Sequence, residues 1–378
     1  MAFNGQAFGI NEPTLTQIAY ICYLLAFFFY AVHLFTSSAR AVTVPSRGVA
    51  LAGAGGSGGT MDVTMGAGDG VSSATTNRRS YSPLLGRIGF ALVAIAWVSL
   101  TGALIVRWVN SGHPPYVTLY EICTMLVWGT TTIFLVLFEG ILKARAAGAF
   151  VVLIIFCLQS YAIWFIDADL QQSVQLVPAL RSYWLLIHVS LAIFAYSSFA
   201  VAAGAGLTYL AKHYSKGQLA AALPSTAAIE EFMFRAVAVG FPFVTLVLIT
   251  GAIWAQEAWT KAWSWDPKEV WALVTWLTYA AYLHVRVQRG VRGVTMAWLS
   301  LFGFIIVLIT FMGVNYLVQW FGLTSMHTYS IDNGAPQGLG VAALGMVGAL
   351  VAGLGLLLFG WLRVKAPMPK KNPNKSEK

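Results

Sequence analysis

Charged residues are scarce in this chain, at 10% of its 378 residues, whereas 58% are hydrophobic. A soluble domain typically carries about a quarter charged residues and less than half apolar ones. This shortage of polar surface excludes a water-soluble enzyme, a disordered chain and a nucleic-acid-binding protein. The composition instead predicts an all-α integral membrane protein.

Cysteine is also rare, because only Cys22, Cys123 and Cys157 occur, each within an apolar run and with no CxxC pair. A disulfide framework, a zinc site and a dithiol redox site all need more cysteines or closer spacings. Any thiol chemistry that involves this protein must therefore come from a partner.

Long apolar runs are what the sequence does contain. Nine of them approach the roughly 20 residues that a helix needs to cross a bilayer. They cover 15–35, 84–107, 119–138, 147–165, 183–211, 232–255, 269–287, 293–320 and 338–362. No Lys or Arg precedes the first run, so we expect an uncleaved anchor with its N-terminus outside. Nine spans then place the C-terminus in the cytoplasm.

The positive charges agree with this topology, because Lys and Arg collect on the cytoplasmic side of membrane proteins. Of 23 Lys and Arg residues, all fall in predicted inner segments except Arg107, Arg181, Lys261 and Lys268. The pattern predicts five segments: a first transmembrane helix (1–36), a flexible Gly/Ser-rich cytoplasmic linker (37–83), a central membrane domain (84–330), a last transmembrane helix (331–364) and a disordered basic tail (365–378). The tail could contact anionic lipid, although a solvated tail is the simpler interpretation.

Tryptophan is abundant, with 14 residues, and it concentrates in one predicted outer segment. This tryptophan segment, residues 254–276, contains Trp254, Trp259, Trp263, Trp265, Trp271 and Trp276. An interfacial aromatic belt would spread its rings over many helix ends. The density favours a surface on which a large planar apolar ligand stacks. Asp266 followed by Pro267 is typical of a helix start, so the seventh span begins beside this surface.

Two histidines flank the tryptophan segment on the same predicted side. His188 lies about one turn inside the start of the fifth span, and His327 lies in the loop after the eighth. Two neutral imidazoles could bind a haem iron axially. The alternative is that each is a hydrogen-bonded structural residue, but their location together favours ligation.

His284 stands 15 residues after Glu269 and would lie about 22 Å deeper at helical rise, near the inner leaflet. A polar residue at such depth needs a partner or a ligand. It could bind a second haem, or it could extend to the interface beside Arg286. His33 ends the first span at similar depth and could pair with His284.

The remaining polar residues of the outer segments have simpler interpretations. His113 lies beside two prolines, which favours a structural turn. Glu121 begins the third span and either caps it or binds a partner. Arg107, Arg181 and Lys268 could bind carboxylates such as haem propionates.

These segments resemble the System II cytochrome c biogenesis proteins of the CcsA or ResC type (CcsB in some genomes). This haem-handling family carries a tryptophan-rich motif called WWD, at residues 254–271 here. The resemblance covers roughly 84–330. It is carried by WAQEAWTKAWSWDPKEVWALVTWLTYAAYLH, GHPPYVTLYE, VPALRSYWLLIHV and GVNYLVQWFGLTSMHTYS. Thr118 departs from the family's usual Asn, and Thr260 stands where Gly commonly follows Trp.

The resemblance implies a site for haem b. His188 and His327 would be its outer axial ligands, and His284 would bind a haem within the bilayer. A ResB-like membrane subunit would supply the second inner ligand, with His33 as a minority alternative. The outer cofactor-binding set would also include Trp254, Trp259, Trp263, Trp265, Asp266 and Trp271.

The function implied by the resemblance is to translocate or hold haem and to present it for thioether attachment to the CxxCH of apocytochrome c. The chain would be the haem-handling subunit of a holocytochrome c synthase complex, with no catalytic residue of its own. It would work with a thioredoxin-like thiol reductase in the bacterial plasma membrane, or the thylakoid membrane in plastid relatives. The alternatives are a haem exporter or chaperone without ligase activity, a b-type electron-transfer cytochrome and, least favoured, a solute transporter.

Overall fold

The computed structural model describes residues 11–40, 81–136, 148–166, 168–174, 176, 180–215, 218–314 and 325. All regular structure in these residues is helical, which confirms the all-α class. The α-helices are α1 (Glu12–Arg40), α2 (Tyr81–Ser111), α3 (Leu119–Ile133), α4 (Gly148–Trp164), α5 (Tyr183–Tyr214), α6 (Gln218–Ala222), α7 (Thr226–Trp259), α8 (Pro267–Gln288) and α9 (Val294–Leu308). A short 3-10 turn, η4 (Ala168–Gln171), and a π turn, η6 (Ile309–Gly313), complete them.

Each of the first eight predicted spans falls on a helix, so the protein is a polytopic membrane protein. Six segments are long and apolar enough to cross a bilayer: Glu12–Thr36, Leu84–Ser111, Leu119–Val136, Tyr183–Tyr214, Thr226–Trp259 and Val294–Met312. Helix α4 is shorter, and α8 is more polar than the others. Run 338–362, the tail 365–378 and most of the linker 37–83 lie outside the described residues, although α1 and α2 cover the linker's two ends. The count of nine spans and the orientation stay predictions.

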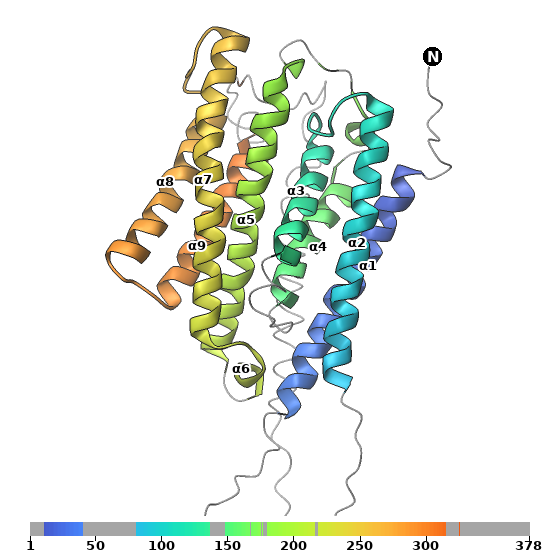
Figure 1. Ribbon diagram of the computed structural model, residues 1–378, viewed down its shortest axis with the longest axis vertical. Helices are drawn as coiled ribbons and strands as arrows, with labels where there is room; N and C mark the ends of the chain where they lie inside the picture. The colour runs from blue at the N-terminus through green and yellow to red at the C-terminus, as the bar shows by residue number, and fades with distance from the viewer. Residues whose placement is uncertain are drawn as a thin grey trace, which may run out of the picture.

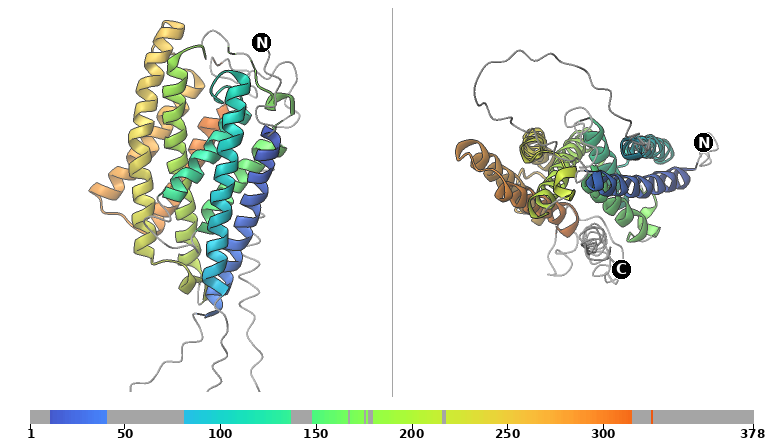
Figure 2. Two further views of the ribbon diagram at one scale, coloured as in Figure 1. Left: turned by 45° about the vertical axis from the view of Figure 1, so that its right-hand side comes forward. Right: turned by 90° about the horizontal axis from the view of Figure 1, so that it is seen from below.

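Helix α5 is the centre of the bundle. It packs against α7 along much of its length and also contacts α3, α4 and α9. Helices α1 and α2 pair with each other on one side, and α8 lies on the other (Figures 1 and 2). Small residues allow the close approach of α5 and α7, since a Cβ added at Gly240 would lie 2.7 Å from Phe199 Cε1.

Threonine hydroxyls join several helices through one repeated arrangement. In each case the hydroxyl donates to the carbonyl four residues earlier, and its oxygen accepts an indole N–H from another helix. The pairs are Trp97 with Thr132 (2.8 Å), Trp128 with Thr101 (2.9 Å) and Trp276 with Thr245 (2.9 Å). These bonds fix large rings between helices without leaving the indole N–H unsatisfied.

The predicted outer segments gather at one end of the bundle. Figure 1 shows the last turns of α2 and α7 and the first turns of α3, α5 and α8 at the top. We call this the upper end. Helix α8 leans away from α7 as it descends, so its C-terminus reaches less far down the bundle than the lower ends of α5 and α7 (Figures 1 and 2).

Candidate functional site

His188 lies in the second turn of α5 and is seated against α7. Its Nδ1 is 3.2 Å from Thr250 Oγ1, and its ring centroid is 5.7 Å from that of Trp254, at an interplanar angle of 63°. A Cβ added at Gly251 would lie 2.9 Å from His188 Cε1, so only glycine leaves room for the ring there. The structure thus brings His188 and Trp254 together. Sequence reasoning missed Thr250 and Gly251, because nothing in the sequence separates them from other small residues of a membrane helix.

Asp266 starts α8 as predicted, with Pro267 at the first helical position. Its Oδ1 accepts hydrogen bonds from the Lys268 backbone N–H (2.9 Å) and from Ser325 Oγ (3.0 Å). Glu269 completes a capping box by accepting from the Asp266 backbone N–H at 3.1 Å. Asp266 therefore has a structural role at the first turn and holds residue 325 beside it.

His327 lies outside the described residues, so its proposed ligand role is not tested by the structure. Ser325, two positions earlier in the sequence, is described and contacts Asp266. Residue 325 therefore lies at the start of α8, beside the tryptophan segment.

The described tryptophans of this segment make different contacts. Trp263 and Trp265 meet edge to face with centroids 5.8 Å apart, while Trp254 contacts His188. Trp265 is 73% exposed, which is unusual for an indole and leaves a wide ring surface at the upper end. Trp259, Trp263 and Trp271 are partly buried. Trp276 binds Thr245 in mid-bundle and so belongs to the helix packing.

Thr260, the family departure after Trp259, ends α7 in the left-handed region with φ of 59°. Glycine is favoured at this position because it has no Cβ to clash. A β-branched residue there is strained by about 1–2 kcal/mol.

Thr260→Gly is expected to stabilise the protein by about 0.5–1 kcal/mol, since relief of strain exceeds the added backbone entropy. Thermal unfolding in detergent should show Tm higher by about 1–3 °C. Thr278→Gly, within right-handed α8, should lower Tm and serves as the control. A Tm that falls for both variants would contradict the strain at Thr260.

Lys268 lies in the first turn of α8 and is partly buried. Burial lowers the pKa of its ammonium to about 8, although the Asp266 carboxylate opposes the shift. Lys268 is thus charged below pH 8 and neutral above it, and its attraction for carboxylates fades as the pH rises through this value.

We expect amine acylation of Lys268, followed by mass spectrometry from pH 6 to 11, to show a midpoint near pH 8. An ordinary lysine gives a midpoint at a pH of about 10.4. A midpoint at the ordinary value would show that Lys268 is not desolvated.

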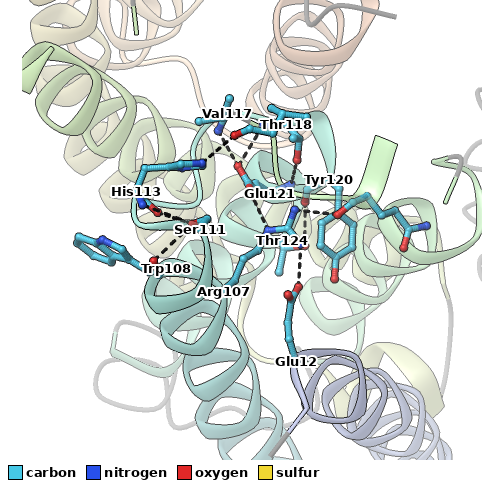
Figure 3. Close-up of polar contacts among 12 residues, drawn as sticks. Glu12, Arg107, Trp108, Ser111, His113, Val117, Thr118, Tyr120, Glu121 and Thr124 are labelled. Carbon is cyan, nitrogen blue, oxygen red and sulfur yellow. Dashed lines mark hydrogen bonds and ion pairs between the residues drawn. The ribbon is translucent and has the colours of Figure 1, made fainter. Parts of the chain in front are cut away.

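Figure 3 shows the loop and helix ends around Glu121. Glu121 caps α3 by accepting from the backbone N–H of Val117 (2.7 Å) and of Thr118 (3.1 Å), while Thr118 Oγ1 accepts from the Glu121 N–H. The capping alternative is confirmed, and Thr118 performs an N-cap role for which Asn is also well suited. His113 is buried, with Nδ1 2.9 Å from Pro114 O and Nε2 3.0 Å from Val174 O. Its structural interpretation is also confirmed.

Arg107 was predicted as a site for ligand carboxylates, and this prediction is wrong. Its Nε donates to Glu121 at 2.7 Å, one terminal nitrogen donates to Glu12 at 2.9 Å, and the other donates to Gln171 O at 2.7 Å. The guanidinium lies 5.0 Å from the ring centroid of Tyr120, and its side chain is 7% exposed (Figure 3). Arg107 therefore joins α1, α2, α3 and η4. Arg181, by contrast, is exposed at the upper end, and its Nε donates to the Leu176 carbonyl.

His284 is exposed on α8, whereas Arg286 turns inward toward Glu230 at 3.7 Å. Since α8 leans, its C-terminal part, which carries His284, does not reach the lower ends of α5 and α7 (Figure 1). His33 is on α1, at the opposite side of the bundle from α8 (Figure 2). The alternative in which His33 and His284 share one metal within this chain stays a prediction, and the separation of α1 and α8 does not favour it.

Comparison with known proteins identifies the family. Residues 116–321, more than half of the chain, match the family described as cytochrome C assembly protein. The chain belongs to this family. It is 34% identical to the cytochrome c biogenesis protein CcsA of Guillardia theta, over 64% of this chain and 85% of that protein. It is 33% identical to CcsA of Chlamydomonas reinhardtii, over 70% and 73%.

These relatives confirm the resemblance to CcsA-type proteins and a role in cytochrome c biogenesis. A similar fold occurs in the solved structure titled Cytochrome c Heme Lyase CcmF, with a TM-score of 0.51 and 15% sequence identity. The match covers 92% of this chain but only about half (51%) of the CcmF chain. The family therefore shares a helical architecture with a longer protein.

Proposed function

We propose that this protein holds haem at its upper end and presents it for covalent attachment to apocytochrome c. The observation that supports this most is the packing of His188 against α7. An imidazole fixed by Thr250 and Gly251 beside Trp254 is suited to ligating a metal that sits among aromatic rings. The family's role in cytochrome c biogenesis makes that metal the haem iron.

The outer site in this proposal uses His188 and His327 as axial ligands. In the described part of the chain, no group of three or more His, Cys, Asp or Glu side chains is placed to hold a metal ion. Haem does not need such a group, because the porphyrin supplies the other four ligands. The exposed Trp265 ring offers a stacking surface, and Arg181 and Lys268 offer cations for the propionates.

The attachment step needs positioning more than catalysis. Each thiol of the CxxCH segment adds across a haem vinyl group, so an S–H bond breaks, a C–S bond forms and the hydrogen goes to the vinyl carbon. No electrons are gained or lost, and the chain contributes proximity and control of iron ligation. The thiols must arrive reduced, and we assign that task to a thioredoxin-like reductase outside this chain.

We place an inner haem b at His284, with its second ligand from a ResB-like membrane subunit. The exposed position of His284 on the outward-leaning α8 supports a ligand that faces another protein. Because α1, which carries His33, and α8 lie on different sides of the bundle, we assign the second ligand to the partner subunit and not to His33. We assign the complex to the bacterial plasma membrane, with the thylakoid membrane as the equivalent in plastids.

The deciding experiment is reconstitution. The purified protein with its ResB-like subunit, reduced CxxCH peptide and haem should give a covalent c-type product in the absorption spectrum and by mass. Haem that binds without forming thioethers would instead indicate an exporter or chaperone. Haem that never exchanges would indicate an electron-transfer cytochrome.

His284→Ala is expected to remove most of the haem that co-purifies with the complex, and added imidazole should restore part of it. Haem per protein is measured by the pyridine haemochrome spectrum. His213→Ala is the matched control, because His213 is exposed near the lower end and stacks on Tyr209 at 6.3 Å. Equal haem content in the His284→Ala and unaltered complexes would remove His284 from the proposal.

A further inference from the structure

We propose that Thr250 is a positioning residue that fixes the tautomer of His188, with the proton on Nδ1 and the lone pair on Nε2. This inference rests on the proposed function of His188 as an iron ligand. It specifies which imidazole nitrogen of His188 binds the iron and which side chain determines that choice.

The argument starts from the single hydrogen of the Thr250 hydroxyl. Thr250 Oγ1 is 2.7 Å from the Leu246 carbonyl one turn earlier, and it is 3.2 Å from His188 Nδ1. A carbonyl can only accept, so the shorter contact takes the hydroxyl hydrogen. Only the oxygen lone pairs then face the imidazole, and His188 Nδ1 has to be the donor.

Three other arrangements in the same molecule have this polarity. Trp97, Trp128 and Trp276 each place an indole N–H 2.8–2.9 Å from a threonine whose hydroxyl reaches the carbonyl four residues earlier at 2.7–2.9 Å. An indole nitrogen has no lone pair to accept with, so the threonine oxygen must be the acceptor in all three. His188 repeats this geometry with an imidazole in place of the indole.

The contacts of the imidazole with Gly251 and Trp254 prevent the ring from flipping. The α7 backbone at Gly251 lies against Cε1, and the Trp254 ring lies at an angle to the imidazole. A ring flip would replace Nδ1 with a carbon opposite Thr250 and lose the hydrogen bond. Metal-bound histidines commonly donate their other N–H to an oxygen, which fixes the ring and raises its basicity. Thr250 supplies that oxygen to His188.

The experiment uses the full chain without haem, labelled with ¹⁵N-histidine and reconstituted in bilayers. Solid-state NMR separates protonated from unprotonated ring nitrogens, and the His188 signal is the one missing from His188→Ala. In the unaltered protein and in Thr250→Ser, we expect the signals of a protonated Nδ1 and an unprotonated Nε2. We expect Thr250→Val, which keeps the shape but not the acceptor, to lose this preference. An Nε2–H signal in the unaltered protein would overturn the proposal.

A second measurement titrates haem into the same proteins. Thr250→Val should bind about 10- to 100-fold more weakly at the outer site, and Thr250→Ser should restore binding. Thr245→Val, which removes the equivalent acceptor for Trp276 on the same helix, should leave both the tautomer and the affinity unchanged. An equal loss in Thr245→Val would mean that helix packing is responsible and would overturn the role of Thr250. If His188→Ala keeps its outer haem, the proposed function fails, whereas the tautomer result stands by itself.

Discussion

Replacing His188 with alanine is expected to abolish holocytochrome c while the membrane protein still accumulates. The substitution removes an imidazole that α7 holds in place, but it leaves the partly buried position filled by a small apolar residue. No other described histidine occupies the upper end except His113, whose two ring nitrogens contact carbonyl oxygens. The measurement is haem staining of c-type cytochromes, with immunoblotting for the protein itself.

A control variant and a chemical rescue test this prediction. His213→Ala removes an exposed imidazole at the lower end and should leave cytochrome levels unchanged. Free imidazole should partly restore cytochrome levels in His188→Ala, because Thr250 and Gly251 still line the space left by the side chain. Normal cytochrome levels in His188→Ala would show that the iron ligand lies elsewhere.

Arg107→Met is expected to cost about 3–5 kcal/mol of folding free energy, the largest stability effect that we foresee. Glu121 is fully buried, and Arg107 holds one of its oxygens at 2.7 Å. Removing the guanidinium leaves the charges of Glu121 and Glu12 at the junction without their cation. Lower accumulation in the membrane and a lower Tm in detergent should both report the loss.

Arg235→Met provides the control at the same bond length. Arg235 also contacts a glutamate at 2.7 Å, but both side chains of that pair are about half exposed. Solvent screens such a pair, so its removal should change stability by less than about 1 kcal/mol. If Arg107→Met were as mild as Arg235→Met, burial would not be what makes the Arg107 contacts strong.

Local patterns in the sequence sufficed to predict the helices and their starts. Apolar runs of span length need only local information, and α1 to α5 and α7 to α9 follow them. Asp266 with Pro267 defines the start of α8 for the same reason, since a capping carboxylate acts within one turn. His113 and Glu121 were likewise interpretable, because their loop contacts involve near neighbours.

Contacts between distant segments could not be predicted in this way. Arg107 looked like an available outer cation, yet one of its partners, Glu12, lies 95 residues away. The tilt of α8 depends on its packing against α7 and α9, and no sequence pattern within α8 predicts this packing. Thr250 and Gly251 become significant only once α5 is seen to place His188 against them.

The carboxylate of Asp266 has a consequence for motion at this end of the molecule. One oxygen of Asp266 serves both the backbone at the start of α8 and the hydroxyl of Ser325. The two donors share one acceptor, so a change in the Ser325 contact changes how this oxygen binds the first turn of α8. Hydrogen exchange of the first amides of α8 should therefore respond to substitution of Ser325.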